Sequence, residues 1–118
     1  MHRRNVLICA AAAASAVLPS LADAQSYPDK PVTIIVPFAA GGGSDNIARL
    51  VAAKLTEKTG KTFIVDNRAG GGTNIGNEAA ARATPDGYTI LLGQFTLSAN
   101  PFLYSNLRYK SDLSLIHI

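Results

Sequence analysis

The sequence has few of the residues on which metal binding, disulfide formation and acid-base catalysis depend. Its single cysteine is Cys9, and its two histidines, His2 and His117, stand near the two ends of the chain. A disulfide requires two cysteines, and a zinc site is built from several cysteines, histidines or carboxylates. A serine hydrolase also needs a base beside its nucleophile. We therefore expect no disulfide, no metal site, no cofactor and no enzymatic activity.

The net charge is small as well. The chain carries eleven basic and eight acidic residues, which gives a formal net charge of +3, and the basic residues form no long run. Proteins that bind nucleic acid through its phosphates normally present a strongly basic patch or stripe. The composition therefore gives no indication of a nucleic-acid partner.

What the sequence does contain begins with an export leader. Two arginines at positions 3 and 4 precede thirteen mostly apolar residues at 6–18, and Ala-Asp-Ala at 22–24 fits the small-x-small cleavage rule. Thirteen residues are too few to span a bilayer as a helix. We predict a signal peptide over residues 1–24, cleaved after Ala24, which leaves a mature chain of 94 residues. The paired arginines leave both the general secretory route and the twin-arginine route open.

The mature chain alternates strand and helix patterns. Apolar runs rich in β-branched residues predict buried strands at 32–36, 62–66 and 88–93. Between them we expect a helix from the N-cap Ser44 to the C′ residue Gly60, and a shorter helix from about 74 through 83. Strands that alternate with helices favour right-handed crossovers and a parallel sheet. The predicted fold class is therefore α/β.

Two weaker patterns complete this prediction. Within the first helix, apolar residues recur at helical spacing on one face, which predicts an amphipathic helix: Ile47, Leu50, Val51 and Leu55. After the third strand, residues 97–103 fit a short helix broken at Pro101, and residues 104–110 fit a loop. Asn100 fits a cap of that helix better than the alternative, a contact with the ligand.

Glycine clusters follow the first and second strands. Gly41 to Gly43 and Gly70 to Gly72 each lie between the carboxyl end of a strand and the start of a helix. Such a turn lets backbone N–H groups approach a ligand, and the unpaired donors of the helix favour a carboxylate or a phosphate. In open parallel sheets, ligands bind beyond the carboxyl ends of the strands. We therefore predict that two junctions converge on one anionic ligand.

The predicted ligand-binding residues all lie at these two junctions: Phe38, Gly41, Gly42, Gly43, Ser44, Asp45, Gly71, Gly72, Thr73 and Asn74. Some members have a competing structural interpretation. Asp45 would repel an anion, so bracing of the loop is the better interpretation of that carboxylate. Phe38 fits a pocket wall and a core position equally well. Either glycine cluster is also compatible with an ordinary tight turn.

Several motifs, taken in order, resemble the beginning of the Bug family of substrate-binding proteins, which serve the tripartite tricarboxylate transporters. They are Tyr-Pro-Asp-Lys-Pro at 27–31 before the first strand, Val-Asp-Asn-Arg-Ala-Gly at 65–70, Ala-Thr-Pro-Asp-Gly-Tyr-Thr at 83–89, and Asn-Pro-Phe-Leu-Tyr at 100–104. One departure is Ala69, which stands where the family usually has proline.

The resemblance implies a type II periplasmic-binding-protein fold, in which two α/β lobes close over a small organic acid without a catalytic step. Residues 25–112 would be the first part of ligand-binding lobe one, with the second lobe absent, and residues 113–118 are predicted to be a non-native tail. The implied location is the periplasm, and the implied partners are a small carboxylate and the membrane permease subunits, with the chain itself a monomer.

Two alternatives stay open at this point. An exported α/β enzyme that acts on a phosphorylated or acidic substrate would also place an anion at the glycine junctions. A fragment with half of its pocket missing would bind no ligand.

Overall fold

A computed structural model describes residues 27–111; the predicted signal peptide and the predicted tail at 113–118 lie outside the described residues. The elements alternate as expected along the chain: β1 (Val32–Val36), α2 (Gly43–Thr59), β2 (Phe63–Asn67), the 3₁₀ turn η2 (Gly71–Thr73), α3 (Asn74–Ala81), β3 (Thr89–Leu91) and α4 (Thr96–Leu103).

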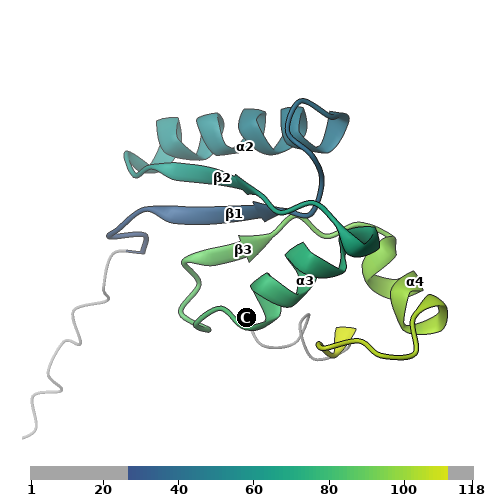
Figure 1. The fold of residues 1–118 in the computed structure, drawn as a ribbon. Helices are drawn as coiled ribbons and strands as arrows, with labels where there is room; N and C mark the ends of the chain where they lie inside the picture. Colours follow the sequence, from purple (N-terminus) through teal and green to yellow (C-terminus); the bar gives the residue numbers. More distant parts are fainter. Residues whose placement is uncertain (1–26, 112–118) are drawn as a thin grey trace, which may run out of the picture.

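The three strands of this part of the chain form one parallel sheet in the order β2-β1-β3. Figure 1 shows α2 on one face of the sheet and α3 on the other, with α4 beyond the carboxyl ends of the strands. Helix α2 packs on β1 and β2, whereas α3 packs on β3 and β1. The predicted α/β class and parallel sheet are confirmed.

The core lies around the central strand. Four of the five residues of β1 are buried, and Ile34 and Val36 pack against Ala48 and Ala52 of α2. The third strand differs from its prediction, because only Thr89–Leu91 pair with β1 and Ile90 is 38% exposed. Ile90 pairs with Ile34 and therefore points to the face covered by α2, but α2 packs on β1 and β2, which leaves Ile90 partly exposed.

Helix α2 begins earlier than expected. Its N-cap is Gly42, and no side chain caps the helix, so the predicted N-cap role of Ser44 is wrong. Ser44 lies inside the first turn, because the helix already begins at Gly43. Glycine is an accepted residue at the N-cap position, although it has no side chain to bond to the first N–H groups. The predicted end is confirmed, since Gly60 has a φ of 68° and its N–H bonds to the Thr56 carbonyl at 2.9 Å.

The face of α2 that packs on the sheet is formed by small residues and not by the larger apolar residues that the helical spacing indicated. Ala48 and Ala52 are buried there, whereas Ile47 and Leu50 are 59% and 65% exposed. Ala48 and Ala52 are four residues apart, so they share one face of the helix, and their small side chains let the helix axis approach the sheet closely. Ile47 and Leu50 point in other directions. The amphipathic pattern therefore indicated a helix correctly but did not indicate its packed face.

Two helix ends also differ from the predictions. Helix α3 ends at Ala81, two residues earlier than expected, and α4 continues through Pro101 instead of breaking there. Proline removes one backbone donor, but the helix still closes after it, because the Tyr104 N–H bonds to the Asn100 carbonyl at 2.9 Å.

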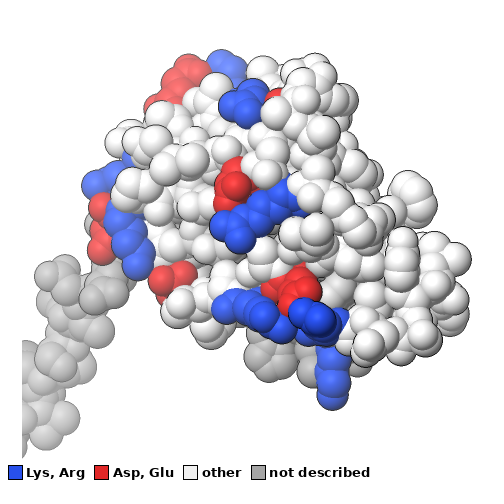
Figure 2. Space-filling view, viewed as in Figure 1, with Lys and Arg blue, Asp and Glu red and all other residues white. Residues whose placement is uncertain are grey.

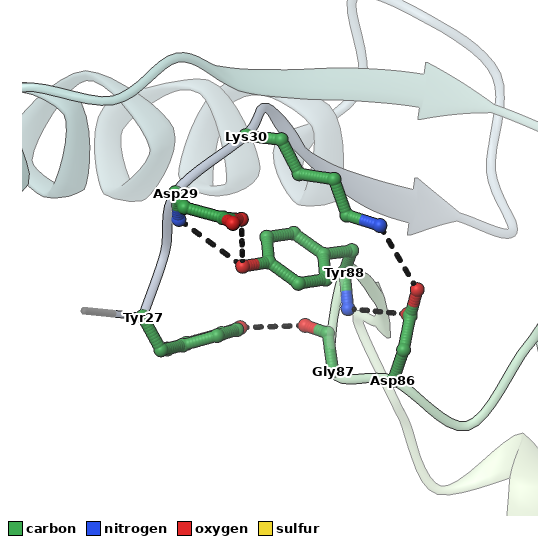
Figure 3. A network of polar contacts seen from close by, with 6 residues as sticks. All are labelled: Tyr27, Asp29, Lys30, Asp86, Gly87 and Tyr88. Carbon is green, nitrogen blue, oxygen red and sulfur yellow. Dashed lines mark hydrogen bonds and ion pairs between the residues drawn. The ribbon is translucent and has the colours of Figure 1, made fainter. Parts of the chain in front are cut away.

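At the amino ends of the strands, opposite the glycine junctions, polar contacts join the segment before β1 to the segment before β3 (Figure 3), and we call them the polar clamp. The Tyr27 hydroxyl donates to the Gly87 carbonyl at 2.5 Å, and the Tyr88 hydroxyl donates to the Asp29 carboxylate. Lys30 Nζ lies 3.3 Å from Asp86 Oδ2 and 4.2 Å from the centre of the Tyr88 ring. The clamp therefore joins residues about 60 positions apart in the sequence.

Replacing Tyr88 with phenylalanine is expected to lower the melting temperature by about 5 °C at pH 7. The hydrogen bond from the Tyr88 hydroxyl, which phenylalanine cannot make, lowers the pKa of Asp29. A lowered carboxyl pKa contributes stability above its ordinary value of about 3.8 and loses that contribution as the pH falls through the folded-state value.

Thermal melting followed by circular dichroism checks this expectation. The difference between wild type and Tyr88→Phe should narrow from pH 7 to pH 2. Lys54→Gln, which breaks an exposed ion pair with Glu57, serves as the control and should shift the melting temperature by less than about 2 °C. Equal shifts for the two variants would show that the clamp does not stabilise the sheet.

Candidate functional site

The two glycine junctions meet at the carboxyl edge of the sheet because they follow adjacent parallel strands. The Asn67 side chain, at the end of β2, donates through Nδ2 to the Phe38 carbonyl at 3.1 Å and to Asp45 Oδ1 at 3.0 Å. The Arg68 N–H bonds to the Val36 carbonyl at 2.8 Å. The structure therefore brings the two predicted junctions together.

The first junction leads from β1 into the exposed start of α2. Gly41, Gly42 and Gly43 are exposed, and Ser44 is half-buried. The N–H groups of the first helical turn have no carbonyl one turn earlier to bond with, so Gly43 and Ser44 present donors toward solvent. Gly41 differs, since its N–H is already bonded to Asp45 Oδ2 at 2.8 Å.

The carboxylate of Asp45 is the brace of this junction. Its side chain is 3% exposed, and besides the Gly41 and Asn67 donors it accepts from Arg49 Nε at 3.0 Å. These hydrogen bonds, chiefly those from Arg49 and the Gly41 N–H, lower the pKa of Asp45 to about 2. The bracing interpretation is the one that the geometry supports, because every contact of the carboxylate is internal.

Gln94 also lies at the carboxyl ends of the strands, beside the first junction, although no sequence pattern indicated it as a site residue. It lies in the segment between β3 and α4, and its Nε2 donates to Ser44 Oγ at 2.6 Å. Because Ser44 Oγ accepts this bond, its own hydrogen remains free to be donated. The one signal in the sequence is position, since Gln94 follows the third strand just as the glycines follow the first two.

The second junction has an unusual backbone. Gly70, Gly71, Gly72 and Thr73 all have positive φ, and the φ of Thr73 is 78°. A side chain at Gly72 would also overlap the hydroxyl of Tyr104. A threonine with positive φ is strained and persists only when its surroundings fix it. The surroundings here are a buried polar network, since the Thr73 hydroxyl donates to Thr96 Oγ1 at 3.0 Å.

Several of the ten predicted residues turn inward. Thr73 is buried, and its hydroxyl is engaged inside the protein, as is Asn74 Oδ1. Phe38 is half-buried and packs against the core formed by β1 and α2. The predicted cap role of Asn100 is wrong, because this residue lies inside α4, is 2% exposed, and donates to the Gly72 carbonyl at 3.0 Å.

Other surface features of the described residues lie apart from these ten. A shallow depression between α2 and β2 includes none of them; its lining residues are Arg49, Ala52, Ala53, Thr56, Glu57, Phe63 and Val65. On the face shown in Figure 2, basic side chains lie beside acidic ones. Within residues 27–111, no helix has the length and apolarity of a membrane span.

Comparison with known proteins identifies the family to which the chain belongs. The family model for the tripartite tricarboxylate transporter family receptor matches residues 47–118. A relative from Agrobacterium vitis, described as a UPF0065 protein in the TAR-I ttuE-ttuC' intergenic region, is 47% identical over 95 residues. That alignment covers 80% of this chain and 28% of the relative.

Solved structures agree with this match. The periplasmic binding protein BugD is 47% identical with a TM-score of 0.68, over 72% of this chain and 28% of BugD. A Rhodopseudomonas palustris protein solved with adipate is 39% identical with a TM-score of 0.69, over 73% and 29% of the two chains. MatC from the same organism, solved with malate, is 36% identical with a TM-score of 0.68, over 73% and 30%.

The chain thus spans about three tenths of the length of the relatives that it matches. Over that length it has the motifs that carry the resemblance, together with the parallel sheet and the strand-to-helix junctions predicted from the sequence. It belongs to the tripartite tricarboxylate transporter receptor family.

Proposed function

We propose that this chain forms the first part of the ligand-binding lobe of an exported receptor, which captures a small dicarboxylate in the periplasm and delivers it to a transporter permease. The observation that carries this proposal is the convergence of two strand-to-helix junctions at one edge of the sheet. Both junctions end at a helix start, where free N–H groups and the helix dipole favour an anion.

The electrostatics of the first junction support an anionic ligand. Asp45 would oppose an anion, but Arg49 Nε lies 3.0 Å from its carboxylate, and the carboxylate accepts two further hydrogen bonds, from the Gly41 N–H and Asn67. The negative charge is therefore compensated within the protein, and the exposed part of the junction consists of backbone donors. Similar proteins solved with malate and with adipate support a carboxylate over a phosphate.

The mechanism that follows is capture by closure of two lobes. The lobe described here holds one side of the ligand, and the part of the receptor beyond this chain's matched length supplies the other side. No step of catalysis is involved, and differential binding to the closed form drives the closure. Residues 25–112 would be the first part of this lobe, and the receptor would act as a monomer.

A chimera tests the proposal directly. Residues 27–111 would replace the matching segment of MatC, so that the relative supplies the second lobe, and malate binding would be measured by calorimetry. We expect the chimera to bind malate. The paired change Gly42→Ala and Gly43→Ala should weaken binding at least tenfold, because methyl groups then shield the first-turn donors. Neither methyl group meets an atom closer than 3.5 Å, so the fold should be retained.

Gly93→Ala is the matched control. The N–H of Gly93 is bonded to the Leu91 carbonyl at 3.0 Å, so it is not a ligand donor, and the affinity should stay within about twofold of the parent. A chimera that is folded but binds neither malate nor adipate would contradict the proposal. Turnover of either acid would favour the alternative of an exported enzyme.

A further inference from the structure

A buried set of amide and hydroxyl side chains lies beneath the second glycine junction, and we call it the asparagine network. Its members come from η2, α3, α4 and the segment after α4: Thr73, Asn74, Asn77, Asn100 and Tyr109. All but Asn74 are more than nine-tenths buried. Because buried polar groups must find partners, the pattern of donors and acceptors within the network is strongly constrained.

The Gly72 carbonyl sets the orientation of Asn100. Asn100 has four acceptors within 3.4 Å of its Nδ2, but an amide nitrogen carries only two hydrogens. The two shortest contacts are to Asn74 Oδ1 at 2.7 Å and to the Gly72 carbonyl at 3.0 Å. A carbonyl only accepts, so the NH₂ group of Asn100 must face Gly72, and the Asn74 atom that contacts it must then be the oxygen.

Tyr109 completes the constraint on Asn74. Its hydroxyl donates to Asn74 Oδ1 at 2.8 Å and accepts from Asn77 Nδ2 at 3.1 Å. Both lone pairs of Asn74 Oδ1 are therefore used. Within residues 27–111, no acceptor is bonded to Asn74 Nδ2, and the side chain is half-buried. The amide is thus held with its oxygen toward the network and its NH₂ group away from it.

We propose that Asn74 is a specificity-determining residue that presents only hydrogen-bond donors to a carboxylate of the ligand, and that Asn100 and Tyr109 are positioning residues that keep its amide from flipping. This inference rests on the proposed function. An amide free to rotate would offer its oxygen as readily as its nitrogen, and an oxygen repels a carboxylate. The network removes that second orientation and so favours an anion at the start of α3.

Asn74→Asp separates this role from a structural one. An aspartate keeps the oxygen that Asn100 and Tyr109 bind, and it is favourable at a helix start, so the melting temperature should change by less than about 3 °C. The NH₂ group, however, becomes a charged oxygen. We expect the malate affinity of the chimera to fall at least a hundredfold at pH 7. An affinity within threefold of the parent would overturn the inference.

A double-mutant cycle tests the positioning by Tyr109. Tyr109→Phe should weaken malate binding about tenfold in the parent, but less than twofold in an Asn74→Ala background, where no amide remains to be oriented. Equal losses in both backgrounds would mean that Tyr109 acts through the fold alone, and would overturn its positioning role. Tyr27→Phe, which removes a hydroxyl at the opposite edge of the sheet, is the matched control and should leave affinity unchanged.

The full 118-residue chain gives a readout without ligand. In NMR spectra, the side-chain NH₂ protons of Asn100 should exchange slowly with solvent, and those of Asn74 should exchange rapidly. The reverse pattern would overturn the proposed orientation. A chimera that binds no acid would overturn the proposed function and this inference together, whereas one that binds malate equally well with Asn74→Asp and Tyr109→Phe would overturn this inference alone.

Discussion

Replacing Gly76 with alanine is expected to lower the free energy of unfolding by about 3 kcal/mol. Gly76 lies in α3 where the helix crosses the end of β1. A Cβ atom there would lie 2.7 Å from Pro37 Cβ, 2.8 Å from Pro37 Cα and 2.9 Å from the Arg68 carbonyl oxygen. Two of these atoms belong to the backbone, so the clash cannot be relieved by rotating a side chain. The two junctions would have to separate.

Urea unfolding of Gly76→Ala, monitored by circular dichroism, measures this loss. The matched control is Gly43→Ala, because a Cβ at Gly43 meets no atom within 4 Å and the residue begins a helix, where alanine is tolerated well. We expect the control to change stability by less than about 0.5 kcal/mol. A Gly76→Ala variant as stable as the control would show that α3 does not cross β1 at this distance.

Replacing Asp45 with asparagine is expected to lower the melting temperature by about 10 °C at pH 7. In either orientation the new amide sets its NH₂ group against a donor: against the Gly41 N–H and Arg49 on one side, or against Asn67 Nδ2 on the other. The first junction would lose the group that fixes its shape, and the Arg49 charge would lose its partner.

The pH dependence of this loss follows from the pKa of Asp45. Its folded-state value of about 2 is below the ordinary 3.8, so the contribution is complete above about pH 4 and is lost as the pH falls through about 2. Melting curves of wild type and Asp45→Asn should therefore converge between pH 4 and pH 2. Asp66→Asn, at an exposed pair with Arg68, is the control and should cost less than about 2 °C. A difference that stays constant down to pH 2 would contradict the bracing role.

The sequence predicts best those features that depend on residues close together in the chain. The buried strand 32–36, the helix end at Gly60 and the two glycine clusters follow from propensity and from backbone freedom, and all are found in the structure. The competing interpretation of Asp45 also came from charge alone, since a carboxylate is a poor partner for an anion.

The sequence was least informative where the cause lies far along the chain. Gln94 and Ser44 are 50 positions apart in the sequence, and Tyr109 and Asn74 are 35 apart. Neither contact can therefore be predicted from the pattern of neighbouring residues. The packed face of α2 was misjudged for a related reason. Its distance from the sheet is set by Ala48 and Ala52, and hydrophobicity alone ranks those residues below Ile47 and Leu50.

The strand order has a consequence for synthesis. The first strand made is the middle strand of the sheet, and both of its neighbours come later: Val32 pairs with Phe63, and Thr33 pairs with Thr89. Contacts between residues so far apart form slowly, because loop closure comes before the gain from pairing. The nascent chain therefore keeps one edge of the apolar strand β1 unpaired until β3 emerges. In the exported receptor proposed above, that delay would extend the time in which an export machinery can engage an unfolded polypeptide.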